Sequence, residues 1–200
     1  MIKVLSYTLV FLGIWILFFK NDTVEYGPGV LAPNEPLQTK IESSKAFVSK
    51  GDIITPLANF ELQAKVLSKE NYSHDRGAKH SPVDLALGWG RMSDESVLSH
   101  LDISQSGRWY RWETQEFPIP RREIETNSAN MHMVPKDEEI ASVLEEVREG
   151  DIVHLKGKLI RIDAQDKGHW KSSLSRTDTG SGACELIFVE ELQIQTPTSY

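Results

Sequence analysis

The densest group of residues suited to recognition chemistry is Arg108-Trp109-Tyr110-Arg111-Trp112. Aromatic rings interleaved with arginine can stack on bases or sugars, and these residue types dominate binding hot spots. In a strand, Trp109 and Arg111 would share one face, and Tyr110 and Trp112 the other. We therefore expect at least one ring to lie outside the main core, and we place the candidate binding surface here. The alternative is burial of both faces.

Two further clusters could form the wall of a pocket, namely Trp89-Gly90-Arg91-Met92 and Asn130-Met131-His132-Met133. Trp89 lies between Gly88 and Gly90, whose small size allows the backbone to approach the indole closely. The candidates from these clusters are Trp89, Arg91 and His132. Packing into the core is the competing interpretation for the three residues.

The sequence contains no convincing catalytic motif. Asp178-Thr179-Gly180-Ser181 has the letters of an aspartic-protease turn, but that chemistry needs a second such carboxylate, and the sequence has no second copy. A glycine-containing turn is the favoured interpretation of this segment. We predict no catalytic residue and no cofactor.

The single cysteine, Cys184, heads an apolar segment, where a buried structural thiol is ordinary. A nucleophilic role with His132 or His154 and an intermolecular disulfide are the alternatives. His74, Asp75 and His80 lack the spacing of a helical metal site, so we expect a polar loop there and no metal.

Composition limits the classes of function. The chain has 200 residues, one cysteine and a formal net charge of −7, which exclude a disulfide framework and disfavour a generic nucleic-acid binder. The first twenty residues hold two lysines and no acid, so the rest carries 20 basic and 29 acidic residues, a balance of −9. We expect no nucleic-acid partner.

Residues 1–20 predict a transmembrane anchor. The run from Val4 to Phe19 has no charge, is flanked by Lys3 and Lys20, and is near the minimum length for a bilayer. A cleaved signal peptide is the alternative, but no small-residue cleavage site follows the run. The short amino-terminal tail favours a single-pass protein of the bacterial inner membrane with a periplasmic body.

The remaining chain divides into three parts. The prolines and glycines of residues 21–51 predict a linker, residues 52–196 a single α+β domain, and residues 197–200 a tail. Within the domain, residues 137–149 predict an amphipathic helix capped by Asp137. Period-two patterns predict strands, among them one over residues 103–113. The expected fold is a small curved sheet or barrel with one or two packed amphipathic helices.

Some short sequence segments resemble segments of known proteins. GDIVHLKGKLI, with a helix before it, resembles the strand-bend-strand of OB-fold-like barrels. SPVDLALGWGRMSD, SGRWYRW and GACELIFVEEL are similar to phrases of uncharacterised bacterial membrane-anchored envelope proteins. The resemblance implies a cell-envelope protein, and we expect a non-catalytic acidic domain that binds a ligand or another envelope protein. The alternatives are a small membrane-anchored hydrolase and an OB-like nucleic-acid-binding module.

Overall fold

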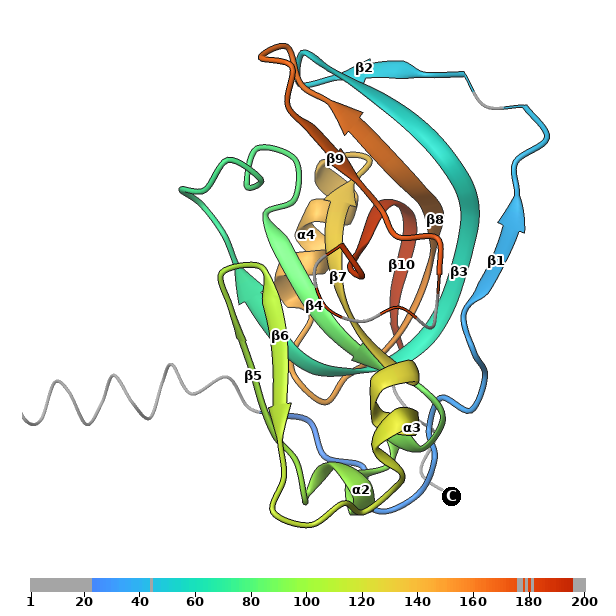
Figure 1. Cartoon of the computed structure of the whole chain (residues 1–200), viewed down its shortest axis with the longest axis vertical. Helices are drawn as coiled ribbons and strands as arrows, with labels where there is room; N and C mark the ends of the chain where they lie inside the picture. Colours follow the sequence, from blue (N-terminus) through green and yellow to red (C-terminus); the bar gives the residue numbers. More distant parts are fainter. Residues whose placement is uncertain (1–22, 44, 176–177, 179, 181, 196–200) are drawn as a thin grey trace, which may run out of the picture.

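Five strands form a closed ring in the computed structural model (Figure 1). They are β3 (Asp52–Asn71), β4 (Val83–Gly88), β7 (Ser128–Pro135), β10 (Glu185–Gln195) and β8 (Ile152–Asp163), in that spatial order. The ring closes because β3 pairs with both β4 and β8. The structure describes residues 23–43, 45–175, 178, 180 and 182–195.

The ring is a mixed sheet. β7 and β10 run parallel, whereas the other four pairings of the ring are antiparallel. Irregularities in register occur twice along β3 and once along β10, and such bulges bend a strand and increase its twist. These pairings and bulges confirm the predicted curved sheet with few helices.

Side chains alternate between the two faces of each strand, and those on the inner face form the core. In β3, Phe60, Leu62 and Ala64 point inward and are buried, while the side chains between them are less buried. They join the buried apolar residues of β4, β7, β8 and β10 in one cluster. The interior of the ring is therefore a packed core rather than a channel.

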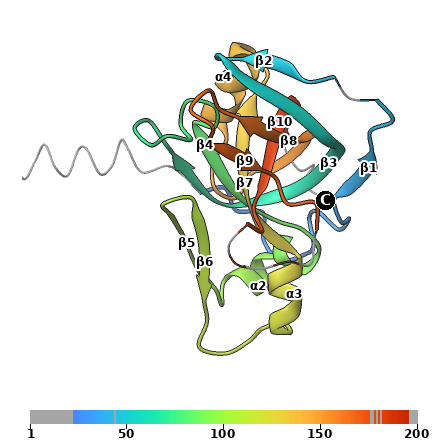
Figure 2. The same cartoon turned by 45° about the horizontal axis from the view of Figure 1, so that its top comes forward.

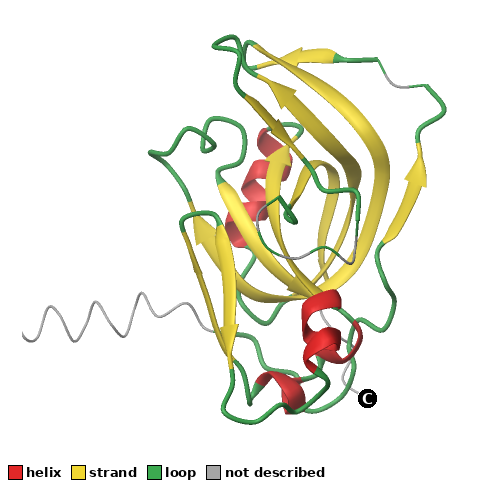
Figure 3. Ribbon diagram, viewed as in Figure 1, coloured by secondary structure: helices red, strands yellow, loops and turns green. Residues whose placement is uncertain are grey.

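Helix α4 (Glu138–Glu146) lies between β7 and β8 in the chain order. It packs against this core. The side chain of Asp137 accepts a hydrogen bond from the backbone N–H of Ile140 and caps the helix, as the sequence predicts. Ile140 and Leu144 are buried in the main cluster. Figure 3 shows α4 apart from the two short helices at the other end of the molecule.

An insertion between β4 and β7 forms a second layer (Figures 1 and 2). It contains the 3-10 turn η1 (Gly90–Ser93), α2 (Glu95–Leu98), β5 (Asp102–Ser106), β6 (Trp109–Glu113) and α3 (Arg121–Thr126). A small cluster of buried side chains holds its helical part together. Among the described strands, β5 and β6 pair with each other and with no other, as a hairpin.

The prediction of one strand over residues 103–113 is wrong, because the chain reverses in the middle. Gly107 and Arg108 have φ values of 58° and 70° and form the turn of the β5–β6 hairpin. Positive φ at Gly107 is cheap, whereas at Arg108 it is unusual for a side-chain-bearing residue.

The segment expected to be a linker is attached to the domain. β1 (Leu37–Lys40) and β2 (Phe47–Ser49) each pair with β3. Five backbone N–H groups within residues 26–32 donate to the side chains of Ser93, Asp94 and Glu95 at 2.6–3.1 Å. An extended segment has unpaired backbone donors, and these acceptors satisfy them.

The expected anchor at residues 1–20 and tail at 197–200 lie outside the described residues. Among the helices that are described, none has both the length and the apolar character required to cross a bilayer.

Candidate functional site

A cleft of about 990 Å³ opens between the loop of residues 72–82, which joins β3 to β4, and the β8–β9 hairpin. β9 (His169–Lys171) is the short outer strand of that hairpin. The lining residues combine charged, histidine and tryptophan side chains: Lys50, Asp52, Asp75, Arg76, Gly77, Lys79, His80, Arg108, Trp109, His132, Ile162, Ala164, Gln165, Asp166, Gly168, His169, Trp170, Lys171, Gly182 and Cys184.

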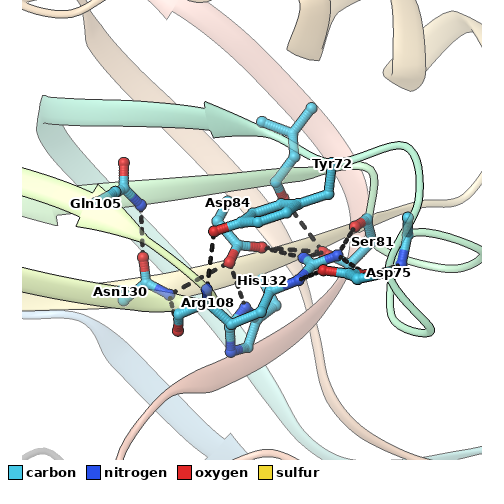
Figure 4. Close-up of polar contacts among 10 residues, drawn as sticks. Tyr72, Asp75, Ser81, Asp84, Gln105, Arg108, Asn130 and His132 are labelled. Carbon is cyan, nitrogen blue, oxygen red and sulfur yellow. Dashed lines mark hydrogen bonds and ion pairs between the residues drawn. The ribbon is translucent and has the colours of Figure 1, made fainter.

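Arg108 reaches from the β5–β6 hairpin to the ring of strands and lines the cleft. Its polar contacts are drawn in Figure 4. Its guanidinium donates to both carboxylate oxygens of Asp75 at 2.7 and 2.8 Å, and to Asp84 Oδ1 at 2.6 Å. It also donates to the carbonyl oxygen of Ser81 at 3.0 Å. The Asp84 side chain is fully buried, so this ion pair is largely shielded from water.

Aromatic rings complete the Arg108 site. The guanidinium carbon lies 3.6 Å from the centre of the Tyr72 ring and 5.7 Å from that of Trp170. The Tyr72 hydroxyl accepts a hydrogen bond from the Arg108 backbone N–H at 2.9 Å. Arg108 is therefore held by its backbone and side chain together. We use the name arginine anchor for the set Tyr72, Asp75, Ser81, Asp84 and Arg108.

A polar chain continues behind the anchor (Figure 4). His132 Nδ1 lies 2.8 Å from Asp84 Oδ2, an ion-pair distance, although the ring N–H is not aligned for a hydrogen bond. The His132 ring contacts Trp170, with centroids 4.7 Å apart. Asn130 donates to Asp84 at 3.4 Å and accepts from Gln105 at 2.6 Å. These contacts connect the hairpin with the wall of the cleft.

A second histidine–aspartate pair lies in the same cleft. His80 Nε2 is 2.7 Å from Asp52 Oδ2, and Lys79 Nζ is 2.6 Å from the same oxygen. The hydrogen bond with His80, followed by that with Lys79, holds the pKa of Asp52 far below its usual range. The buried Nδ1 atom of His80 has no hydrogen-bond partner among the described residues.

The mouth of the cleft is bridged by a different arginine–aspartate pair. Arg76 Nη2 donates to both carboxylate oxygens of Asp166 at 2.5 Å, joining the 72–82 loop to the β8–β9 turn. Gly168 permits this approach, since a side chain there would collide with the Arg76 guanidinium. Both partners are largely exposed, at 70% and 63% of the side-chain surface. We call Arg76 and Asp166 the mouth pair.

A smaller cleft of about 450 Å³ lies beneath β6 and shares Trp109 and Cys184 with the larger one. Burial, followed by the charge of Glu185, raises the pKa of Cys184 to about 11. The thiol is therefore protonated at neutral pH, which is opposite to the activation that a nucleophilic cysteine needs.

Of the five residues proposed as a binding surface, Arg108 lies in the hairpin turn, and the other four separate onto the two faces of β6, as alternation predicts. Trp109 is 41% exposed and Arg111 is exposed. On the other face, Trp112 packs edge-on against Phe117. The Tyr110 hydroxyl donates to Ser128, and burial raises the Tyr110 pKa to about 12.

Only part of the predicted set meets at the larger cleft, namely Arg108, Trp109 and His132. Trp89 is buried in the main core, and Arg91 forms an ion pair with Glu123 on the insertion. Neither residue lines either of the two clefts.

Sequence reasoning missed most of the cleft. Asp52, Arg76, Lys79, Asp166 and Trp170 come from segments far apart in the chain. One signal was available in Asp84, a carboxylate within the apolar run of residues 82–89, because a buried acid requires a partner. Within the described residues, no group of three or more His, Cys, Asp and Glu side chains is placed to hold a metal ion.

Comparison of the chain with known protein families, curated proteins and solved structures found no match.

Proposed function

We propose that this is a membrane-anchored, non-catalytic protein of the bacterial cell envelope whose barrel binds a ligand or partner in the large cleft. The observation that carries the proposal is the cleft itself, about 990 Å³ in volume and lined by exposed cations, histidines and tryptophans. Binding sites are typically concave, with a few convergent polar groups and aromatic walls.

The strand order supports an OB-like barrel as the scaffold. The ring runs β3-β4-β7-β10-β8, its third and fifth members in the chain are parallel, and α4 lies between the third and fourth. In OB-folds, the loops between the first two and the last two strands bind oligonucleotides and oligosaccharides. The loop of residues 72–82 and the segment containing β9 hold these places here.

The envelope location is supported by the uncharged run of residues 4–19. The docked segment 26–32 follows that run closely, so an anchored chain would hold the barrel near the bilayer on a short tether. The balance of −9 in residues 21–200 supports a protein or small-molecule partner over nucleic acid, because phosphate backbones attract basic surfaces.

A hydrolase is the second candidate, because two histidines with aspartate partners line one cleft. The Cys184 thiol, with its pKa raised to about 11, is a poor nucleophile for such an enzyme. Cys184→Ser is expected to keep the phenotype of the native chain in a complemented deletion strain. Loss of function at normal protein levels would favour the hydrolase instead.

Site-directed photo-crosslinking in cells that express the full chain tests the binding proposal. A photoreactive amino acid at His169, exposed on the cleft, is expected to give a discrete adduct after irradiation. The same amino acid at Glu146, exposed at the end of α4 and outside the cleft, is the matched control. Adducts at Glu146 but none at His169 would contradict a binding site in the cleft.

A further inference from the structure

The large cleft has an excess of positive side chains in a chain that is acidic overall. Five cationic residues line it against three acidic ones: Lys50, Arg76, Lys79, Arg108 and Lys171, and Asp52, Asp75 and Asp166. The whole chain has a formal net charge of −7. A local excess of one sign inside a cleft attracts ligands of the opposite sign.

Two of these cations are committed to buried carboxylates. Arg108 contacts Asp84, which is fully buried, and Lys79 contacts Asp52, which is nearly so. Separating either pair would remove the permanent positive charge beside a buried carboxylate, which is costly. Arg108 and Lys79 therefore stay with their intramolecular partners when a ligand enters.

The other three cationic side chains are available to bind a ligand. Lys50 and Lys171 are exposed, and neither has a carboxylate within ion-pair distance in the described part of the chain. Lys50 Nζ donates to the carbonyl oxygen of Lys79 at 2.8 Å, a neutral partner that leaves its charge uncompensated. Among the residues that the structure describes, Asp166 alone forms an ion pair with Arg76, and both are so exposed that water can replace either partner at little cost. Asp166 thus occupies a position that an external acid could take.

We infer that the ligand of this cleft carries an oxyanion, phosphate or carboxylate, which displaces Asp166 from Arg76 and is held by Arg76 together with Lys50 and Lys171. The inference rests on the proposed function and specifies its ligand class. Asp166 acts as an internal competitor. Removing its charge should therefore strengthen oxyanion binding by more than removing a carboxylate elsewhere on the surface does.

Calorimetric titration of the full chain in phosphatidylcholine nanodiscs with inorganic pyrophosphate, and separately with citrate, tests the inference. Saturable binding of at least one probe is expected. Asp166→Asn should tighten it about 2–5-fold and Lys171→Ala should weaken it by about the same factor, in line with single exposed ion pairs. Added salt should weaken it for every variant.

Matched controls separate a local effect from a general change of charge. Asp163→Asn removes a carboxylate that also pairs with an arginine and lies three residues away, and Lys156→Ala removes a half-exposed lysine of β8. Neither residue lines the cleft, and both variants should bind as the native chain does. An equal gain from Asp163→Asn and Asp166→Asn would overturn the internal-competitor role.

The source of the oxyanion follows from repeating the titration in phosphatidylglycerol nanodiscs. Weaker pyrophosphate binding there identifies a lipid headgroup as competitor, and unchanged binding identifies a soluble ligand; both results support an oxyanion site. Absence of binding for both probes overturns the inference. If His169 still gives a discrete crosslinked adduct in that case, the cleft binds a non-anionic ligand and the proposed function stands.

Discussion

The arginine anchor and the mouth pair both join an arginine to aspartate, and they differ in burial. Arg108 is 17% exposed and contacts a carboxylate with no exposure, whereas Arg76 and Asp166 are both more than half exposed. A buried ion pair is costly to break from one side, while an exposed pair contributes about 0–1 kcal/mol. Burial therefore makes Arg108 a fixed part of the architecture and leaves Arg76 free to exchange partners.

Arg108→Ala should have the largest effect on stability. The substitution removes the guanidinium that pairs with the buried carboxylate of Asp84. Loss of one partner of a buried ion pair costs about 3–5 kcal/mol. The measurement is urea denaturation of the full chain, followed by circular dichroism. Arg108→Lys should recover little, because an ammonium cannot contact Asp75, Asp84 and Ser81 at once. A loss below about 1 kcal/mol would show that Asp84 finds another partner.

Leu144→Ala should lower the free energy of unfolding by about 2–5 kcal/mol, because Leu144 is fully buried in the main core and its loss leaves a cavity. Ser142→Ala, at an exposed position of the same helix, is the control and should stay within about 0.5 kcal/mol of the native chain. Equal melting curves for the two variants would place α4 outside the cooperative core.

Asp75→Asn should alter the acid limb of the stability curve. Hydrogen bonds from Arg108 lower the pKa of Asp75 in the folded protein. The stabilisation from the ionised form is fully present above the unfolded pKa of about 3.9 and is lost as pH falls through the folded value. Between about pH 5 and about pH 3, the native chain should lose more stability than Asp75→Asn. Parallel curves for the two proteins would contradict this coupling.

Arg76→Ala should have the smallest effect on stability, at most about 1 kcal/mol, because the mouth pair is exposed. Its effect on oxyanion binding should instead equal or exceed that of Lys171→Ala. The contrast with Arg108→Ala is therefore between a variant that binds poorly but melts normally and one that unfolds. A large fall in melting temperature for Arg76→Ala would remove the distinction between the two pairs.

The sequence predicts local features better than the site. The pattern at 137–149 predicts helix α4, observed at Glu138–Glu146, because its cap and its apolar stripe lie within one short segment. The ring closure joins β3 to β8, strands that begin about one hundred residues apart, and no local pattern specifies that pairing. Local composition alone predicts a linker at 26–32, since the partners of this segment, Asp94 and Glu95, lie in a distant helix start.

The candidate site was predicted in part for the same reason. The cluster 108–112 was recognisable by composition, but its separation into an anchoring arginine and an exposed tryptophan depends on the turn at Gly107. The mouth pair joins residues ninety positions apart. Neither member belongs to a motif, so only the folded structure identifies them.

The most direct test of the account is to observe the two arginines separately by nuclear magnetic resonance. In the ¹⁵N-labelled full chain in detergent micelles, the side-chain Nε–H signals of Arg76 and Arg108 can be assigned by comparison with Arg76→Lys and Arg108→Lys. Addition of pyrophosphate or citrate should shift the Arg76 signal in a saturable manner and leave the Arg108 signal in place. A shift of the Arg108 signal with an unchanged Arg76 signal would contradict the assignment of the fixed and exchangeable pairs.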